Sequence, residues 1–136
     1  MAYDNSYTTI SLSYVVLFMD IASFADEKHI YLTTIGRRTG RPHTVELWFA
    51  VAHENLYLSH EGKYTDWMKN ILNNNRLSFT IKSLNGEGMA RIVSSGDAFE
   101  TGKSALYHKY YGKACKDVID DWFSESTVIE IMFDAH

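Results

Sequence analysis

The sequence is poor in cysteine and proline and contains no long hydrophobic run. Its one cysteine, Cys115, excludes an internal disulfide and any zinc site built on several thiolates, and favours a reducing compartment. The longest apolar stretch, residues 10–25, is interrupted by serine and aspartate and falls short of the roughly 20 apolar residues that cross a bilayer. Residues 1–9 lack the basic start of a signal peptide. We therefore expect a cytoplasmic protein without a membrane span.

The composition is that of an ordinary globular chain. Of 136 residues, 46% are apolar and 22% charged, and no low-complexity tract is present, which excludes a disordered tail. This length suits one domain, so residues 1–136 are predicted to form a single domain with a helical N-terminal extension over residues 1–23. A net charge of -4 argues against general nucleic-acid binding.

Hydrophobic periodicity predicts a mainly β protein of the α+β class. Alternation with period two and enrichment in β-branched and aromatic residues predict six strands, at residues 29–35, 44–51, 56–59, 77–82, 88–93 (extendable toward 99) and 127–133. Helical spacing predicts helices at residues 64–72, from about 101 to a break at Gly112, and at 118–123. Residues 86–88 predict a hairpin turn. Short connections favour an antiparallel barrel with helices packed on it.

An arginine-rich loop, residues 36–41, connects the first two predicted strands. It holds three of the five arginines, and Gly36 and Gly40 permit a tight turn that presents backbone N–H groups inward. Together with the hydroxyl of Thr39, these donors predict a site for phosphate or carboxylate. The alternative interpretation is a solvated hairpin tip whose arginines keep a sheet edge soluble.

A second candidate anion site lies where a strand ends and a helix begins, in residues 59–70. Lys63 follows Gly62 close to the predicted helix start, and helix N-termini attract anions. The alternative is that Thr65 or Asp66 caps the helix while Trp67 sits in the core.

These segments resemble a known superfamily, the split-barrel flavin and deazaflavin oxidoreductases, which contains pyridoxamine-phosphate oxidase and the deazaflavin-dependent nitroreductases. The resemblance spans residues 24–133. The matching motifs are YLTTIGRRTGRP at residues 31–42, VELWF at 45–49, Trp67 with Asn70, residues 76–81, KYYG at 109–112 and Trp122.

The resemblance implies a six-stranded antiparallel split β-barrel of the FMN-binding type, with flanking helices. It also implies a homodimer with the cofactor in a groove near the subunit interface. The implied cofactor is either F420, a deazaflavin, or FMN. F420 is favoured because three arginines suit its longer acidic tail. The positions that match the family's cofactor-binding residues are Arg37, Arg38, Thr39, Arg41, His43, Thr44, Val45, Glu46, Ser59, His60, Gly62, Lys63, Trp67 and Asn70. Many deazaflavin-dependent nitroreductases have proline where this chain has Glu46.

The implied function is that of an oxidoreductase. Hydride would pass between the bound cofactor and a small organic acceptor such as a quinone, nitro compound or enone. No catalytic residue is assigned; Tyr107, Tyr110 and Tyr111 are candidate proton donors, or simply pack as aromatic residues of a helix. A non-catalytic carrier or sensor of the same cofactor is the alternative function, and a barrel for single-stranded nucleic acid is a third hypothesis. The histidines lack metal-ligand spacing, so no metal site is expected.

Overall fold

The computed structural model describes residues 21–133, which form seven strands and three helices. The strands are β1 (His29–Ile35), β2 (Pro42–Trp48), β3 (Ala50–Ala52), β4 (Asn55–Glu61), β5 (Arg76–Ile81), β6 (Leu84–Val93) and β7 (Ser126–Phe133). The helices are α2 (Asp66–Asn73), α3 (Gly96–Tyr111) and α4 (Lys116–Trp122). None of the helices within this range is long and apolar enough to cross a membrane.

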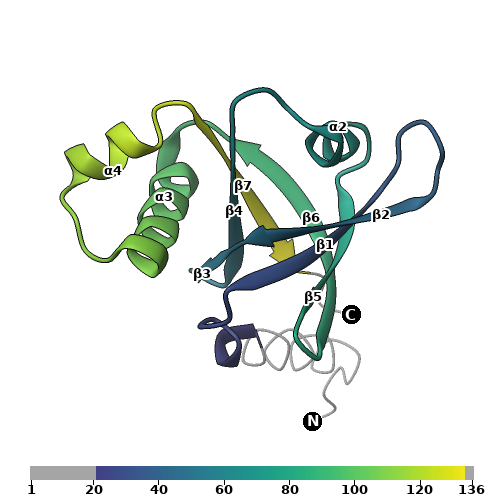
Figure 1. Ribbon diagram of the computed structural model, residues 1–136, viewed down its shortest axis with the longest axis horizontal. Helices are drawn as coiled ribbons and strands as arrows, with labels where there is room; N and C mark the ends of the chain where they lie inside the picture. The colour runs from purple at the N-terminus through teal and green to yellow at the C-terminus, as the bar shows by residue number, and fades with distance from the viewer. Residues whose placement is uncertain (1–20, 134–136) are drawn as a thin grey trace, which may run out of the picture.

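All seven strands belong to one antiparallel sheet in the order β2-β1-β5-β6-β7-β4-β3 (Figure 1). The mainly β, antiparallel class is therefore confirmed, and the fold is consistent with a split barrel, but the sheet has seven strands and not six, and it is not closed. The sheet stays open between β2 and β3, although these two edge strands follow one another in the chain.

The additional strand arises at Phe49, where the strand predicted over residues 44–51 divides. The segment before Phe49 pairs with β1, and the segment after it pairs with β4. The backbone N–H of Phe49 donates to the hydroxyl of Tyr110 (3.0 Å) instead of a neighbouring strand. Because this partner comes from α3, the alternation of residues 44–51 could not reveal the division.

The main hydrophobic core lies on the inner face of the curved sheet. Alternate residues of β1, Ile30, Leu32 and Thr34, are fully buried, as the period-two pattern requires. Helix α2 adds Trp67, Met68 and Ile71 to this core. Leu72 belongs to the apolar spacing that predicts this helix, but its side chain is 64% exposed and does not join the core, so the prediction is wrong at this position.

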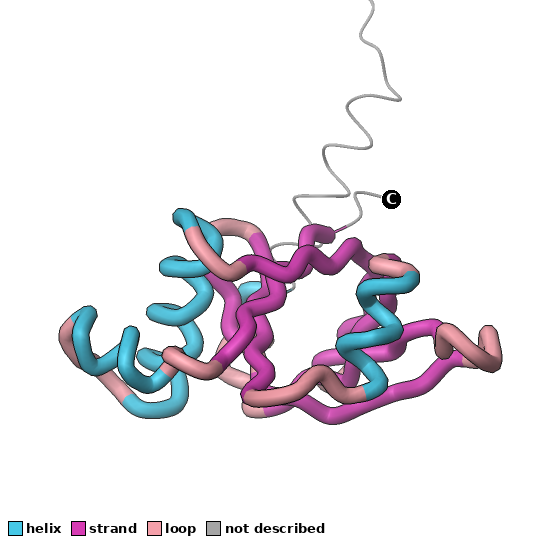
Figure 2. Tube along the Cα trace, turned by 90° about the horizontal axis from the view of Figure 1, so that it is seen from above, coloured by secondary structure: helices cyan, strands magenta, loops and turns pink. Residues whose placement is uncertain are grey.

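A second core lies between α3 and the outer face of the sheet. It contains Tyr57 of β4 and Val128 of β7, together with Leu106 of α3 and Ile119 and Phe123 from the α4 segment. Figure 2 shows α3 and α4 together on one side of the ring of strands, with α2 on the other side. The two cores thus separate the chain into a region around α2 and a region around α3 and α4.

Two local predictions differ from the structure for reasons of packing. The turn falls at residues 82–83 and not at 86–88, which lie within β6. A β-carbon at Gly86 would overlap the Phe79 ring, and one at Gly88 the backbone of Met132, so both glycines allow close packing. The strand does not extend toward residue 99, because α3 begins at Gly96 (φ +86°).

The predicted N-terminal helix within residues 1–23 lies outside the described residues, except for residues 21–23, which are helical. Ile21 is fully buried in the main core.

Candidate functional site

The arginine-rich loop between β1 and β2 is a compact turn closed by its own backbone. The N–H of Gly36 donates to the carbonyl of Arg41 (2.8 Å), and the N–H of Gly40 donates to that of Gly36 (2.9 Å). Gly40 adopts a φ of +68°, which favours glycine. The N–H of Arg41 donates to Oγ1 of Thr39 (3.1 Å). The loop therefore does not present a continuous row of free N–H groups.

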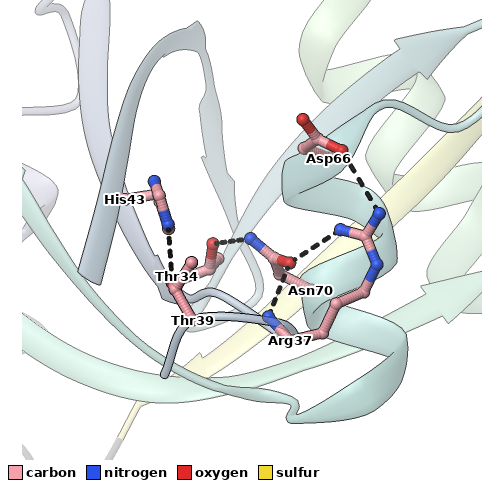
Figure 3. A network of polar contacts seen from close by, with 6 residues as sticks. All are labelled: Thr34, Arg37, Thr39, His43, Asp66 and Asn70. Atoms are coloured by element: carbon pink, nitrogen blue, oxygen red, sulfur yellow. Dashed lines mark hydrogen bonds and ion pairs between the residues drawn. The ribbon is translucent and has the colours of Figure 1, made fainter. Parts of the chain in front are cut away.

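Helix α2 holds this loop through a buried amide (Figure 3). Oδ1 of Asn70 accepts from the backbone N–H of Arg37 (3.2 Å) and from its Nη1 (3.1 Å). Nδ2 of Asn70 donates to Oγ1 of Thr34 (3.2 Å), which is fully buried in β1. Nη2 of Arg37 also pairs with Oδ1 of Asp66 (3.3 Å). One network thus connects β1, the loop and the first turns of α2.

His43 covers the start of the loop. Its Nε2 lies 3.3 Å from Oγ1 of Thr39 (Figure 3). A β-carbon on Gly36 would come within 2.7 Å of both atoms, so the absence of a side chain at Gly36 makes room for them. His43 and Thr39 are both exposed and stand at the mouth of the site.

The loop, the start of β2 and the start of α2 enclose a pocket of about 400 Å³, within the size range of small-molecule sites. Its lining residues are Gly36, Arg37, Arg38, Thr39, His43, Thr44, Val45, Asp66, Trp67 and Asn70. Eight of these are among the fourteen positions predicted from the sequence. Sequence reasoning did not assign Gly36 or Asp66 to the site, although both stood inside the segments it selected.

This pocket has an unbalanced set of charges. Arg37 is opposed by Asp66, whereas Arg38 is exposed and makes no ion pair with any residue in the range 21–133. The pocket can therefore attract a phosphate or carboxylate group.

The chain as a whole matches one protein family. The model of the family described as "Pyridoxamine 5'-phosphate oxidase" matches residues 20–135. The protein belongs to this family. Membership confirms the family resemblance inferred from the sequence motifs.

Several solved structures share the fold of this family member, and the proteins they belong to have different names and functions. Protein Rv2991 from Mycobacterium tuberculosis is 23% identical, with a TM-score of 0.69 over 87% of this chain and 84% of that one. A protein titled F420 Reductase is 21% identical, with a TM-score of 0.58 over 82% and 90% of the two chains. HutZ, the heme storage protein from Vibrio cholerae, is 14% identical, with a TM-score of 0.60 over 85% and 88%. No curated protein sequence matches significantly. At these identities the structures show a shared fold.

Six predicted positions do not line the pocket of this family member. They are Arg41, Glu46, Ser59, His60, Gly62 and Lys63. The His60 ring stands edge-on to Trp67 (5.8 Å between centroids), which does line the pocket. Nε2 of His60 lies 2.8 Å from the carbonyl oxygen of Lys63, and the N–H of Gly62 donates to the carbonyl of Glu125 (3.3 Å). Ser59 and His60 therefore belong to the end of β4, and Gly62 and Lys63 follow it, next to Trp67 but outside the pocket lining.

Glu46 has a partner in the adjacent strand. Its Oε1 lies 3.2 Å from Nδ1 of His29 in the adjacent strand. Among residues 21–133, no group of three or more His, Cys, Asp or Glu side chains is arranged to hold a metal ion.

The three tyrosines suggested as proton donors lie outside the pocket lining. The Tyr110 hydroxyl accepts from the N–H of Phe49 and lies 2.8 Å from the carbonyl oxygens of Phe49 and Lys28. Burial raises the pKa of this phenol. The Tyr110 ring stacks on Trp48 at 4.3 Å between centroids. Tyr111 packs against Tyr107 (5.2 Å). These rings pack on the side of α3 and α4.

Sequence reasoning missed the contacts of Lys109. Its Nζ donates to the carbonyls of Glu27 (2.7 Å) and Phe49 (2.8 Å) and lies 3.6 Å from the centroid of the Phe49 ring. Burial lowers its pKa to about 8. With Tyr110, Lys109 fixes the point at which β2 ends and β3 begins.

Proposed function

We propose that the protein binds a flavin-type cofactor in the pocket beside the arginine-rich loop and works as an oxidoreductase. F420 is the favoured cofactor and FMN the second. The observation that supports this proposal best is the pocket of about 400 Å³ with the exposed guanidinium of Arg38 at one end and the edge strand β2 along one side. Membership of the pyridoxamine 5'-phosphate oxidase family and the common fold with an F420 reductase support it further.

The donor set fits the anionic end of such a cofactor. A guanidinium binds phosphate or carboxylate through paired N–H donors, and Arg38 is not engaged by a carboxylate among residues 21–133. Arg41 lies outside the pocket lining, on the loop end that faces solvent, where it would meet a tail that extends beyond the pocket. This arrangement favours F420, whose acidic tail is longer.

The edge position of β2 suits the planar part of the cofactor. β2 pairs only with β1, so alternate N–H and C=O groups point away from the sheet. His43, Thr44 and Val45 of this strand line the pocket. Free backbone donors and acceptors at fixed spacing would orient the ring without a dedicated side chain.

The chain's own contribution is binding and orientation. When bound, the cofactor supplies hydride chemistry, and a quinone, nitro compound or enone is the class of acceptor that it would reduce. Trp67 closes the base of the pocket with an apolar surface and excludes water there.

A non-catalytic carrier or sensor is the second candidate function. It is favoured by the position of Tyr107, Tyr110 and Tyr111, none of which lines the pocket. Within residues 21–133, no phenol therefore lines the proposed site to deliver a proton to an acceptor.

Titration with FMN and with F420, followed by absorbance and fluorescence, tests the proposal. We expect saturable binding with tighter binding of F420. Reduced cofactor is then mixed with a panel of quinones, nitroaromatics and enones. Oxidation of the cofactor supports the enzyme, and binding without oxidation across the panel supports the carrier. Failure to bind either cofactor contradicts both.

We also propose that the protein is a cytoplasmic homodimer. The outer faces of β1, β6 and β7 expose Tyr31, Ile35, Met89 and Met132, and the helices among residues 21–133 cover the other end of the sheet. An exposed apolar face of this kind suits a second copy of the chain. Sedimentation of the purified protein is expected to give twice the monomer mass, and a monomer at all concentrations would contradict the dimer.

A further inference from the structure

The three arginines of the loop at residues 36–41 have different environments. The side chain of Arg37 is 22% exposed and bound at two points, to Asn70 and to Asp66. Arg38 and Arg41 are exposed, and their guanidinium groups have no hydrogen-bond partner in the described part of the chain. The loop therefore holds two kinds of arginine: the guanidinium of Arg37 is bound within the protein, and those of Arg38 and Arg41 are not.

The contacts of Arg37 leave it little capacity for an anion. Oδ1 of Asn70, which has two lone pairs, accepts both the backbone N–H and Nη1 of this one residue. Nη2 is turned toward the carboxylate of Asp66. An anion at Nη2 would stand beside that carboxylate and experience its repulsion. The geometry of Arg37 is that of a clamp between the loop and α2.

The tip of the loop has the opposite character. Gly36, Arg37, Gly40 and Arg41 direct their backbone N–H groups to acceptors within the protein. The N–H groups of Arg38 and Thr39 have no acceptor among residues 21–133. Two successive free N–H groups beside an exposed guanidinium form a small concave set of anion donors.

We propose that Arg37 and Arg38 divide the work of the loop. Arg38, with the backbone N–H groups of Arg38 and Thr39, contacts the anionic end of the ligand. Arg37 is a positioning residue that holds the loop tip over the pocket by bridging Asn70 and Asp66. The identity of the ligand, a flavin-type cofactor with a phosphate group, rests on the proposed function, whereas the clamp is a property of the protein without ligand.

Two matched variants, Arg37→Gln and Arg38→Gln, test this division. The melting temperature of each is measured without ligand, and the affinity for FMN and for F420 is measured at a series of KCl concentrations. Loss of a direct contact with an anion flattens the dependence of log Kd on log salt, because one fewer charge pair is left for salt to screen, and loss of a positioning residue flattens it less.

For Arg38→Gln we expect an unchanged melting temperature, affinity weaker by about tenfold or more, and a flatter salt dependence. For Arg37→Gln we expect a melting temperature lower by about 3 to 5 °C, weaker binding, and a smaller change in the salt dependence than Arg38→Gln shows. If Arg37→Gln does not fold, Arg37→Lys takes its place, because lysine keeps the charge but cannot bridge two partners.

Two results would overturn the division. One is an Arg37 variant that melts like the wild type and flattens the salt dependence as much as Arg38→Gln does. The other is an Arg38→Gln protein with wild-type affinity and salt dependence. If the wild type binds neither cofactor, the proposed function is wrong, and the melting temperatures alone decide the clamp: equal values for the Arg37 and Arg38 variants overturn it.

Discussion

The α2 region and the α3–α4 region use charged side chains in opposite ways. In the α3–α4 region, the side chain of Lys103 is 5% exposed, and its ammonium pairs with Asp120 (2.7 Å) and Glu100 (3.2 Å). Asp120 also binds Lys116, and the hydrogen bond from Lys103 is the main reason why the pKa of Asp120 is lowered. Two lysines and two acids therefore neutralise one another and fasten α4 to α3.

The α2 region has an excess of cations around its pocket. Asp66 opposes Arg37, while Arg38 and Arg41 extend from the same loop without a carboxylate partner among residues 21–133. Leaving like charges close together costs stability, so a region that does so has a use for the field they create. The α3–α4 charges are therefore structural, and the unpaired charges of the loop are the ones that the proposed ligand would meet.

Substitution of a tightly packed glycine is expected to give the largest difference in stability loss between the two regions. In Gly102→Val, the new side chain would enter the second core, where a β-carbon comes within 2.7 Å of Val128 and 2.8 Å of Tyr57. Both neighbours are buried and cannot withdraw. We expect the free energy of unfolding to fall by about 2 to 3 kcal/mol. Urea denaturation measures it.

Two control variants make this test specific. Ser104→Val places the same side chain on a less buried position of α3 and should change the unfolding free energy by less than about 1 kcal/mol. In Gly36→Ala, the β-carbon comes within 2.7 Å of Thr39 and His43, but both side chains are exposed and can turn away. This variant should therefore alter the shape of the pocket and leave the unfolding free energy nearly unchanged. A Gly36→Ala protein as unstable as Gly102→Val would contradict the contrast.

The buried amide of the α2 region gives the next largest effect. Asn70→Ala leaves the hydroxyl of Thr34, which is fully buried, without its donor and releases the loop from α2. We expect a loss of about 2 kcal/mol of unfolding free energy, since an unsatisfied buried polar group costs roughly this much. Asn73→Ala, at an exposed position of the same helix, is the control and should be nearly silent.

A cofactor titration of the same pair sharpens the result. Asn70→Ala should bind FMN and F420 more weakly than Asn73→Ala does, because the arginine-rich loop loses its anchor. Equal affinities would mean that the loop keeps its position without Asn70.

The strands were predictable because their determinants are local. The alternation at His29–Ile35 defines β1 at its observed bounds, and β4, β5 and β7 differ from prediction by at most two residues at an end. The division of the second strand was not predictable, because the hydroxyl that binds the backbone of Phe49 belongs to Tyr110, 61 residues later. The glycines at residues 86 and 88 misled the prediction because their role is to admit Phe79 and Met132.

The same distinction applies to the candidate site. The arginine-rich loop was identifiable from its own residues, and the structure places it at the pocket. The different roles of its arginines depend on Asp66 and Asn70, which come from α2 more than two dozen residues later in the sequence. Residues 59–63, the end of β4 and the two residues after it, were selected by the same local chemistry, but in the fold they lie beside Trp67 without lining the pocket.

The smallest expected effect concerns Lys109. Like Arg37, Lys109 is a cation that connects two segments of the chain, here at Glu27 and Phe49, but no carboxylate is in contact with it among residues 21–133. Its ammonium binds only carbonyl oxygens, and burial lowers its pKa to about 8 in the folded protein, from an ordinary value of 10.5. Between these two pH values the unfolded chain binds more protons than the native chain does. The free energy of unfolding should therefore gain a contribution that increases as the pH rises from 8 to 10.5.

Lys109→Met removes this titration. Tyrosines and other groups also titrate at alkaline pH, so the quantity to measure is the difference in unfolding free energy between the wild type and Lys109→Met, by urea denaturation at several pH values above 7. That difference should grow in favour of the wild type as the pH rises through 8. Lys113→Met, at an exposed lysine, is the control for loss of a positive charge and should retain the wild-type pH dependence. A constant difference for Lys109→Met would show that the pKa of Lys109 is the same in the folded and unfolded protein. Burial of the ammonium beside Phe49 would then make no contribution to the pH dependence of the unfolding free energy.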